Sequence, residues 1–99
     1  MFKLQNYING ELVSPVKGQY IDNYEPSKGE VYSLIPDSDH EDVAMATAAA
    51  KEAFKTWSKT PAAERSRIMM AISDNINKNL DKLAAAESKD NGKPLTLAT

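Results

Sequence analysis

A long amphipathic segment between Ser38 and Lys59 most constrains how this chain can fold. Its apolar side chains recur at spacings of three and four residues, which places them on one stripe of an α-helix. These side chains are Val43, Ala46, Ala50, Ala53, Phe54 and Trp57. Ser38 is a good N-cap, and Glu41 three residues later completes the spacing of a capping box. Because exposing such an apolar stripe to water is unfavourable, the helix must dock on another surface.

Two β-hairpins are predicted between about residues 4 and 35. Asn9 and Gly10 separate two short strand-like runs, and both residue types tolerate the positive φ of a type I′ turn. In the second hairpin, Pro26 presets φ at the start of a turn and Gly29 can adopt positive φ at its end. The sequence of this part of the chain therefore predicts β-structure.

Three helices are predicted to follow, at about residues 38–59, 61–78 and 80–91. Thr60 is the expected N-cap of the second helix, with Pro61 at its first helical position. Gly92 is placed just beyond the third helix, and Pro94 prevents its continuation. The order predicts an α+β fold. Short hairpins and alanine-rich stripes give a thin core, so residues 1–99 are interpreted as a single incomplete domain.

Composition excludes several classes of function. The net charge is −2, which disfavours a nucleic-acid partner, and no apolar run is long enough to span a membrane. The chain has no cysteine, so it lacks disulfides, thiolate metal sites and a cysteine nucleophile. No secretory signal is recognised, and a cytoplasmic location is expected.

The acidic residues before the long helix invite a metal interpretation. A calcium loop needs a glycine at its sixth position and a glutamate at its twelfth, but a loop starting at Asp37 has Asp42 and Ala48 there. These carboxylates are better explained as partners of the helix N-terminus. His40, the only histidine, is expected to be a solvated surface residue.

Several short pieces, taken in order, resemble the N-terminal segment of the NAD(P)-dependent aldehyde dehydrogenase superfamily. They are Tyr7-Ile8-Asn9-Gly10-Glu11, Pro26-Ser27-Lys28-Gly29-Glu30-Val31, Ala53-Phe54-Lys55-Thr56-Trp57, Glu64-Arg65 and Asp90-Asn91-Gly92-Lys93-Pro94. The stretch Ala86–Asp90, together with Tyr24-Glu25-Pro26-Ser27 and Glu30-Val31-Tyr32, looks most like the 2-hydroxymuconic and 2-aminomuconic semialdehyde dehydrogenases. Glu25 and Lys28 depart from the asparagine and threonine usual in the family, at surface turn positions.

The resemblance implies that this chain is part of a cofactor-binding α/β domain. In the family, a cysteine attacks the aldehyde, NAD or NADP accepts a hydride, and a glutamate activates water to release the acid. The cysteine, glutamate and Rossmann loops lie downstream of the matching segment. No catalytic or cofactor-binding residue is therefore assigned here, neither nucleotide is expected to bind the chain alone, and the chain alone is predicted to be catalytically inert.

The resemblance also implies a structural monovalent cation, K⁺ or Na⁺. Many relatives bind it through two backbone carbonyls before the turn and one carboxylate, positions that match Asn23, Tyr24 and Asp90. A further ligand comes from downstream, so the isolated chain should hold the ion poorly. The alternative is that Asp90 is only a surface residue near a helix end.

Two kinds of partner would cover the long helix. One is the remainder of an aldehyde dehydrogenase, and the other is a second copy of this chain. An independent protein-interaction module that pairs through the stripe or through open strand edges is the alternative function. In each case we expect Phe54 and Trp57 to be partly exposed within a single chain.

Overall fold

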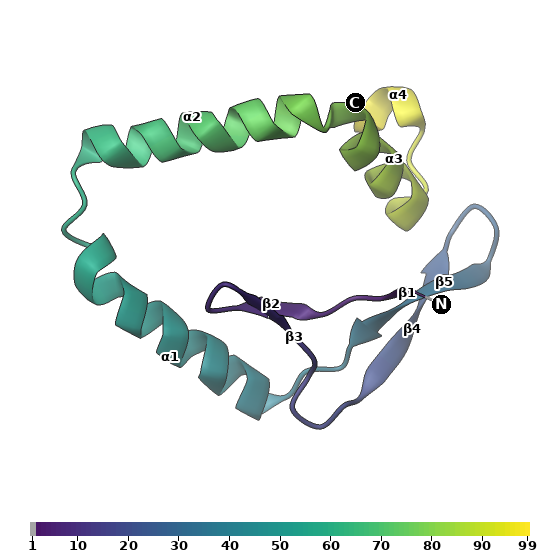
Figure 1. Ribbon diagram of the computed structural model, residues 1–99. Coiled ribbons are helices and arrows are strands. Elements are labelled where there is room, and N and C mark those ends of the chain that lie inside the picture. The colour runs from purple at the N-terminus through teal and green to yellow at the C-terminus, as the bar shows by residue number, and fades with distance from the viewer. Residues whose placement is uncertain (1) are drawn as a thin grey trace. The chain divides into compact units, whose positions relative to one another are not determined.

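The computed structural model describes residues 2–99 and shows five strands followed by four helices (Figure 1). The strands are β1 (Phe2–Lys3), β2 (Asn6–Ile8), β3 (Glu11–Val13), β4 (Tyr20–Glu25) and β5 (Glu30–Pro36). The helices are α1 (His40–Trp57), α2 (Ala62–Lys78), α3 (Leu80–Asn91) and α4 (Leu95–Ala98). The predicted α+β class is confirmed.

The chain divides into two compact units, which we describe separately. The first contains the chain up to Tyr24 together with Val31–Lys59, and the second contains Glu25–Glu30 with Thr60–Thr99. The interpretation of residues 1–99 as a single incomplete domain stays a prediction.

In the first unit, β2 and β3 form the predicted antiparallel hairpin. Tyr7 is paired with Leu12, and Ile8 with Glu11, which leaves a two-residue turn. At that turn Asn9 has a φ of 54° and Gly10 a φ of 80°. Both values lie in the left-handed region that a type I′ turn requires, so the turn prediction is confirmed.

A second sheet has the strand order β1-β5-β4, with β1 parallel to β5. The β1 strand was not predicted, because two residues are too few to show a periodic pattern. It pairs Phe2 with Ser33, and the amide of Leu4 continues the ladder by donating to the Leu34 carbonyl at 2.8 Å. Ser33 is completely buried, and its Oγ accepts a hydrogen bond from Asn23 Nδ2 at 3.0 Å.

The N-cap of helix α1 lies one residue later than predicted. Asp39, not Ser38, is the N-cap, and Asp42, not Glu41, is the reciprocal partner in the capping box. Asp39 Oδ1 accepts from the Glu41 amide at 2.9 Å, while Asp42 Oδ2 accepts from the Asp39 amide at 3.0 Å. Two carboxylates form stronger bonds to these amides than the Ser38 hydroxyl would, so the prediction was wrong by one position.

The same carboxylates fasten the preceding loop to the start of α1. Asp42 is only 5% exposed, and its Oδ1 accepts from the Val16 amide at 2.8 Å. Lys17 Nζ lies 2.7 Å from Asp39 Oδ2. This ion pair is the main reason that the pKa of Asp39 is lowered, with backbone hydrogen bonds from Glu41 and Asp42 contributing. Ser38 instead accepts from Asn6 Nδ2 at 2.8 Å, which ties β2 to the same helix end.

In the second unit, helix α2 also begins later than expected. Pro61 has an extended ψ of 150° and is the N-cap, so Thr60 is not the cap and Pro61 is not the first helical residue. The Pro61 carbonyl accepts from the Glu64 and Arg65 amides, both at 3.1 Å. Helices α2 and α3 meet at Asn79, as the predicted break near this residue requires.

The end of α3 lies against the turn between β4 and β5. Gly92 caps the helix with a φ of 80°, as predicted, and its amide donates to the Ser88 carbonyl at 2.9 Å. A Cβ on Gly92 would lie 3.3 Å from Pro26 Cβ. The one-turn helix α4 that follows was not predicted, because the pattern ended at Pro94.

Replacing Asp42 with alanine should destabilise the first unit. The change leaves the Val16 and Asp39 amides without their acceptor, at a cost of about 1–3 kcal/mol in the free energy of unfolding. Urea unfolding followed by circular dichroism measures this loss. Glu41→Ala is the matched control, because Glu41 is an exposed first-turn carboxylate, and it should change the free energy by about 0.5 kcal/mol or less. Equal effects of the two changes would contradict the assigned role.

The Asp39 carboxyl should titrate below its ordinary pKa of about 3.9. Because the folded-state pKa is depressed, this group stabilises the fold above the unfolded-state pKa, and the contribution is lost as pH falls through the folded-state value. Side-chain carboxyl NMR shifts followed against pH measure the midpoint. Lys17→Ala should move it upward, whereas Lys51→Ala, on an exposed part of α1, should not. An unchanged midpoint in Lys17→Ala would refute the assigned cause.

Alanine at Gly92 should be more destabilising than alanine at Gly18. Both glycines have positive φ, 80° and 67°, so each substitution carries a left-handed backbone cost of about 1 kcal/mol. Only at Gly92 does the new Cβ also crowd Pro26, whereas nothing lies within 4 Å at Gly18. Urea unfolding of the two variants gives the comparison, and a larger loss for Gly18→Ala would show that the Pro26 contact is not tight.

Candidate functional site

The three predicted cation ligands come from two elements. Asn23 and Tyr24 are consecutive in β4 of the first unit, and Asp90 is in the last turn of α3 in the second. The Asn23 side chain is held by its bond to the buried Ser33. Within residues 2–99, no group of three His, Cys, Asp or Glu side chains could hold a metal ion. Binding through backbone carbonyls and one carboxylate stays a prediction.

The acidic residues at the start of α1 have structural roles. Asp39 and Asp42 accept hydrogen bonds from backbone amides at the helix N-terminus, as the interpretation of this cluster expected. His40, the first residue of α1, is exposed, which confirms its predicted position at the surface. Sequence reasoning missed that Asp42 also holds the Val16 amide. The spacing of Asp39 and Asp42, three residues apart as in a capping box, was the signal for their reciprocal role.

The apolar stripe of α1 is exposed. Phe54 is 60% exposed and Trp57 47% exposed, so the expectation that both are partly uncovered within one chain is confirmed. Val43, nearer the start of the helix, is 62% exposed. We call the six stripe residues Val43, Ala46, Ala50, Ala53, Phe54 and Trp57 the α1 face. Exposed apolar area of this extent indicates a docking surface.

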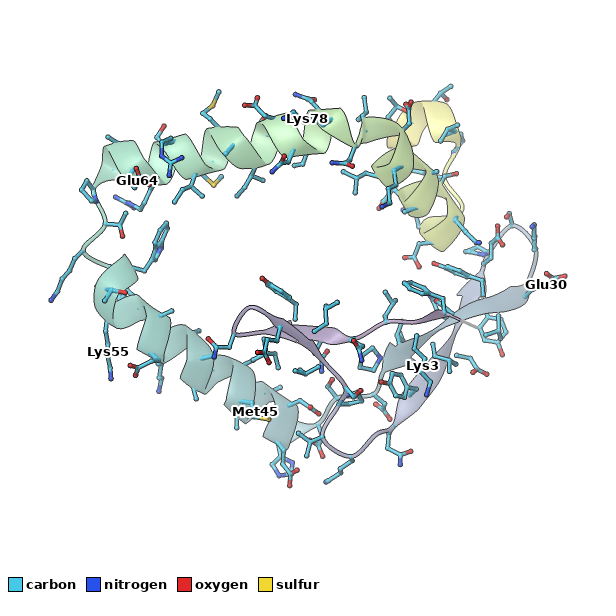
Figure 2. All side chains as sticks on the ribbon, in the orientation of Figure 1. Lys3, Glu30, Met45, Lys55, Glu64 and Lys78 are labelled. Atoms are coloured by element: carbon cyan, nitrogen blue, oxygen red, sulfur yellow. The ribbon has the colours of Figure 1, made fainter. Side chains whose placement is uncertain are left out.

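The β2–β3 hairpin borders the α1 face within the first unit. Strand β2 contacts α1, and Figure 1 shows the hairpin beside this helix. A shallow recess lies between them, lined by Tyr7–Gly10 of the hairpin and by alanines 46, 49, 50 and 53 of α1. Small alanine side chains permit a close approach of another element to this part of the helix. Polar side chains such as Lys55 occupy another part of the helix surface (Figure 2).

Helix α2 carries a second uncovered apolar surface. None of its residues is buried. Met69 is 66% exposed, and Ile72 and Ile76 are about half exposed. Ile72 and Ile76 line a shallow recess with Leu83 of α3, inside the second unit. Helices in both units therefore have exposed apolar faces. Among residues 2–99, no helix is long and apolar enough to cross a membrane.

The sequence of this chain has counterparts among known proteins. The sequence model of the aldehyde dehydrogenase family matches residues 13–99. The chain is 44% identical over 98 residues to the 2-aminomuconic semialdehyde dehydrogenase of Mus musculus, covering 99% of this chain and 20% of the relative. It is 45% identical over 93 residues to an aldehyde dehydrogenase of Deinococcus radiodurans, covering 94% and 18%, respectively.

The fold of the chain also matches a solved structure of an aldehyde dehydrogenase. An NAD-dependent aldehyde dehydrogenase from Sinorhizobium meliloti superposes on 97% of this chain with a TM-score of 0.90 and 36% sequence identity. The match covers 20% of that structure. The chain thus spans about a fifth of the length of the relatives it matches. Because the family match takes in most of its residues, the chain belongs to the aldehyde dehydrogenase family.

Proposed function

We propose that this chain is the N-terminal portion of an NAD(P)-dependent oxidoreductase that converts an aldehyde to a carboxylic acid, and that it is catalytically inert alone. The observation that carries the proposal is an uncovered α1 face in a segment that matches a fifth of each aldehyde dehydrogenase compared. The substrate is proposed only as an aldehyde, since relatives with different names match at 44% and 45% identity.

The chemistry of the residues present supports inactivity. The chain has no cysteine to attack an aldehyde carbonyl. It also has no glycine-rich G-x-G-x-x-G sequence, so its residues do not fit a nucleotide site of that type. In this proposal, the part of the enzyme outside these 99 residues supplies the nucleophile and the nicotinamide cofactor. The cation ligands Asn23, Tyr24 and Asp90 are proposed on the resemblance alone.

Docking on the rest of the enzyme would remove the α1 face from water. Full burial of one large apolar side chain stabilises a protein by about 1.5–3 kcal/mol, and Phe54 and Trp57 each have about half of their surface to contribute. Ala46, Ala50 and Ala53, which precede them on the α1 face, have small side chains that allow a neighbouring element to approach closely. This segment is therefore proposed to act as a structural part of the enzyme through the α1 face.

The purified chain should form no NADH or NADPH when it is incubated with aldehydes and either nucleotide. The Deinococcus radiodurans relative, shortened by its own matching segment and checked for folding by circular dichroism, serves as the acceptor, and adding the chain should restore turnover. Absorbance of the reduced nucleotide is the readout. Turnover by the chain alone, maintained through further purification, would overturn the proposed inactivity.

Two matched variants test the role of the α1 face. Phe54→Asp introduces a carboxylate into the face and should prevent restoration of turnover, because the charge would be buried on docking. Thr56→Asp adds the same charge at an exposed position outside the α1 face and should restore turnover like the parent chain. If both variants behave alike, docking does not use this surface. Light scattering should then be used to look for a defined dimer, the result expected of an independent interaction module.

A further inference from the structure

We infer that Asn9 is a site of spontaneous deamidation, and that the structure protects the chemically identical Asn91-Gly92 pair. The chain contains two Asn-Gly sequences, and glycine after asparagine leaves the following amide nitrogen unhindered. The two pairs therefore have the same local chemistry. Their surroundings in the fold differ.

The reaction needs only water as a co-reactant. The deprotonated backbone nitrogen of the following glycine attacks the asparagine Cγ, a C–N bond forms, and the bond from Cγ to Nδ2 breaks with release of ammonia. Water then adds to one of the two carbonyls of the cyclic imide. Opening in one direction leaves an aspartyl residue, and opening in the other leaves an isoaspartyl residue whose backbone runs through the side chain.

The Asn9-Gly10 pair is open to this attack. Both residues are exposed at the tip of the β2–β3 hairpin. A Cβ built on Gly10 would meet no atom within 4 Å, so the space beside the Gly10 Cα is open. Within the described residues, the Gly10 amide donates no hydrogen bond that would have to break first. The hairpin has three residues in each strand, and so short a hairpin opens readily.

The Asn91-Gly92 pair is held by several contacts. The Gly92 amide donates to the Ser88 carbonyl at 2.9 Å. Asn91 Nδ2 donates to Glu87 Oε1 at 2.6 Å, and Asn91 Oδ1 accepts from the Lys93 amide at 2.9 Å. Both the nucleophile and the amide that must be attacked are therefore engaged. The close approach of Pro26 to Gly92 further restricts rotation of this backbone.

Deamidation at Asn9 would change the charge and the backbone of the β2–β3 turn, which lies beside α1 in the first unit. Asn9 and Gly10 line the recess beside alanines 46, 49, 50 and 53 of α1. A new carboxylate there would add a negative charge at the edge of this recess. An isoaspartyl residue would also lengthen the backbone of a two-residue turn and disturb the pairing of Ile8 with Glu11.

The test follows both sites in one sample. The 99-residue chain is aged at neutral and mildly alkaline pH, digested, and analysed by mass spectrometry for replacement of the amide by a carboxyl group. We expect deamidation at Asn9 to be about tenfold or more faster than at Asn91, because reaction at Asn91 requires three hydrogen bonds to break. Labelling by an isoaspartyl methyltransferase should appear in the peptide containing position 9.

Asn9→Gly is the matched variant, because glycine adopts the positive φ of this turn without strain. It should abolish most of the isoaspartyl labelling and leave the rate at Asn91 unchanged. In concentrated urea the two sites of the parent chain should react at similar rates, since the protecting contacts are lost. Equal rates in native buffer, a faster reaction at Asn91, or full labelling of Asn9→Gly would each overturn the inference.

Discussion

The scarcity of buried apolar side chains is the constraint on which the rest of this structure depends. Among the described residues, Ala84 is the one hydrophobic side chain that reaches burial, at 3% exposure. Ser33 and Asp42, both polar, are covered to a similar degree. A fold of this kind gains little from the hydrophobic effect within itself. The open faces of α1 and α2 are the consequence.

Polar contacts therefore orient the elements, because few buried apolar side chains hold them together. Asp42 bonds the loop amide of Val16 and the cap residue Asp39, so one buried carboxylate joins the loop to α1. Ser38 joins the same helix end to β2 through Asn6. Such bonds are directional, and each is costly to leave unsatisfied. They hold the hairpin beside α1, where β2 contacts the helix.

Sequence reasoning succeeded where a local preference had no competitor. The Asn9-Gly10 turn and the Gly92 helix end follow from the need for positive φ, and both were confirmed. It failed where several residues could fill one role. Ser38 and Thr60 were reasonable caps, but Asp39 and Pro61 occupy those positions. It also missed the Phe2–Lys3 strand and the helix Leu95–Ala98, because segments this short carry no measurable periodicity.

The sequence by itself determined the types of the longer elements, the apolar stripe of α1 and the absence of a cysteine nucleophile, since each follows from residue identity and spacing. The tertiary structure alone decided which contacts join distant residues. The parallel pairing of β1 with β5, the bond from Val16 to Asp42 and the contact of Pro26 with Gly92 each link segments far apart in the chain. It also decided that two identical Asn-Gly pairs have different surroundings. Local propensity does not predict these long-range contacts, because they depend on the folding of the whole chain.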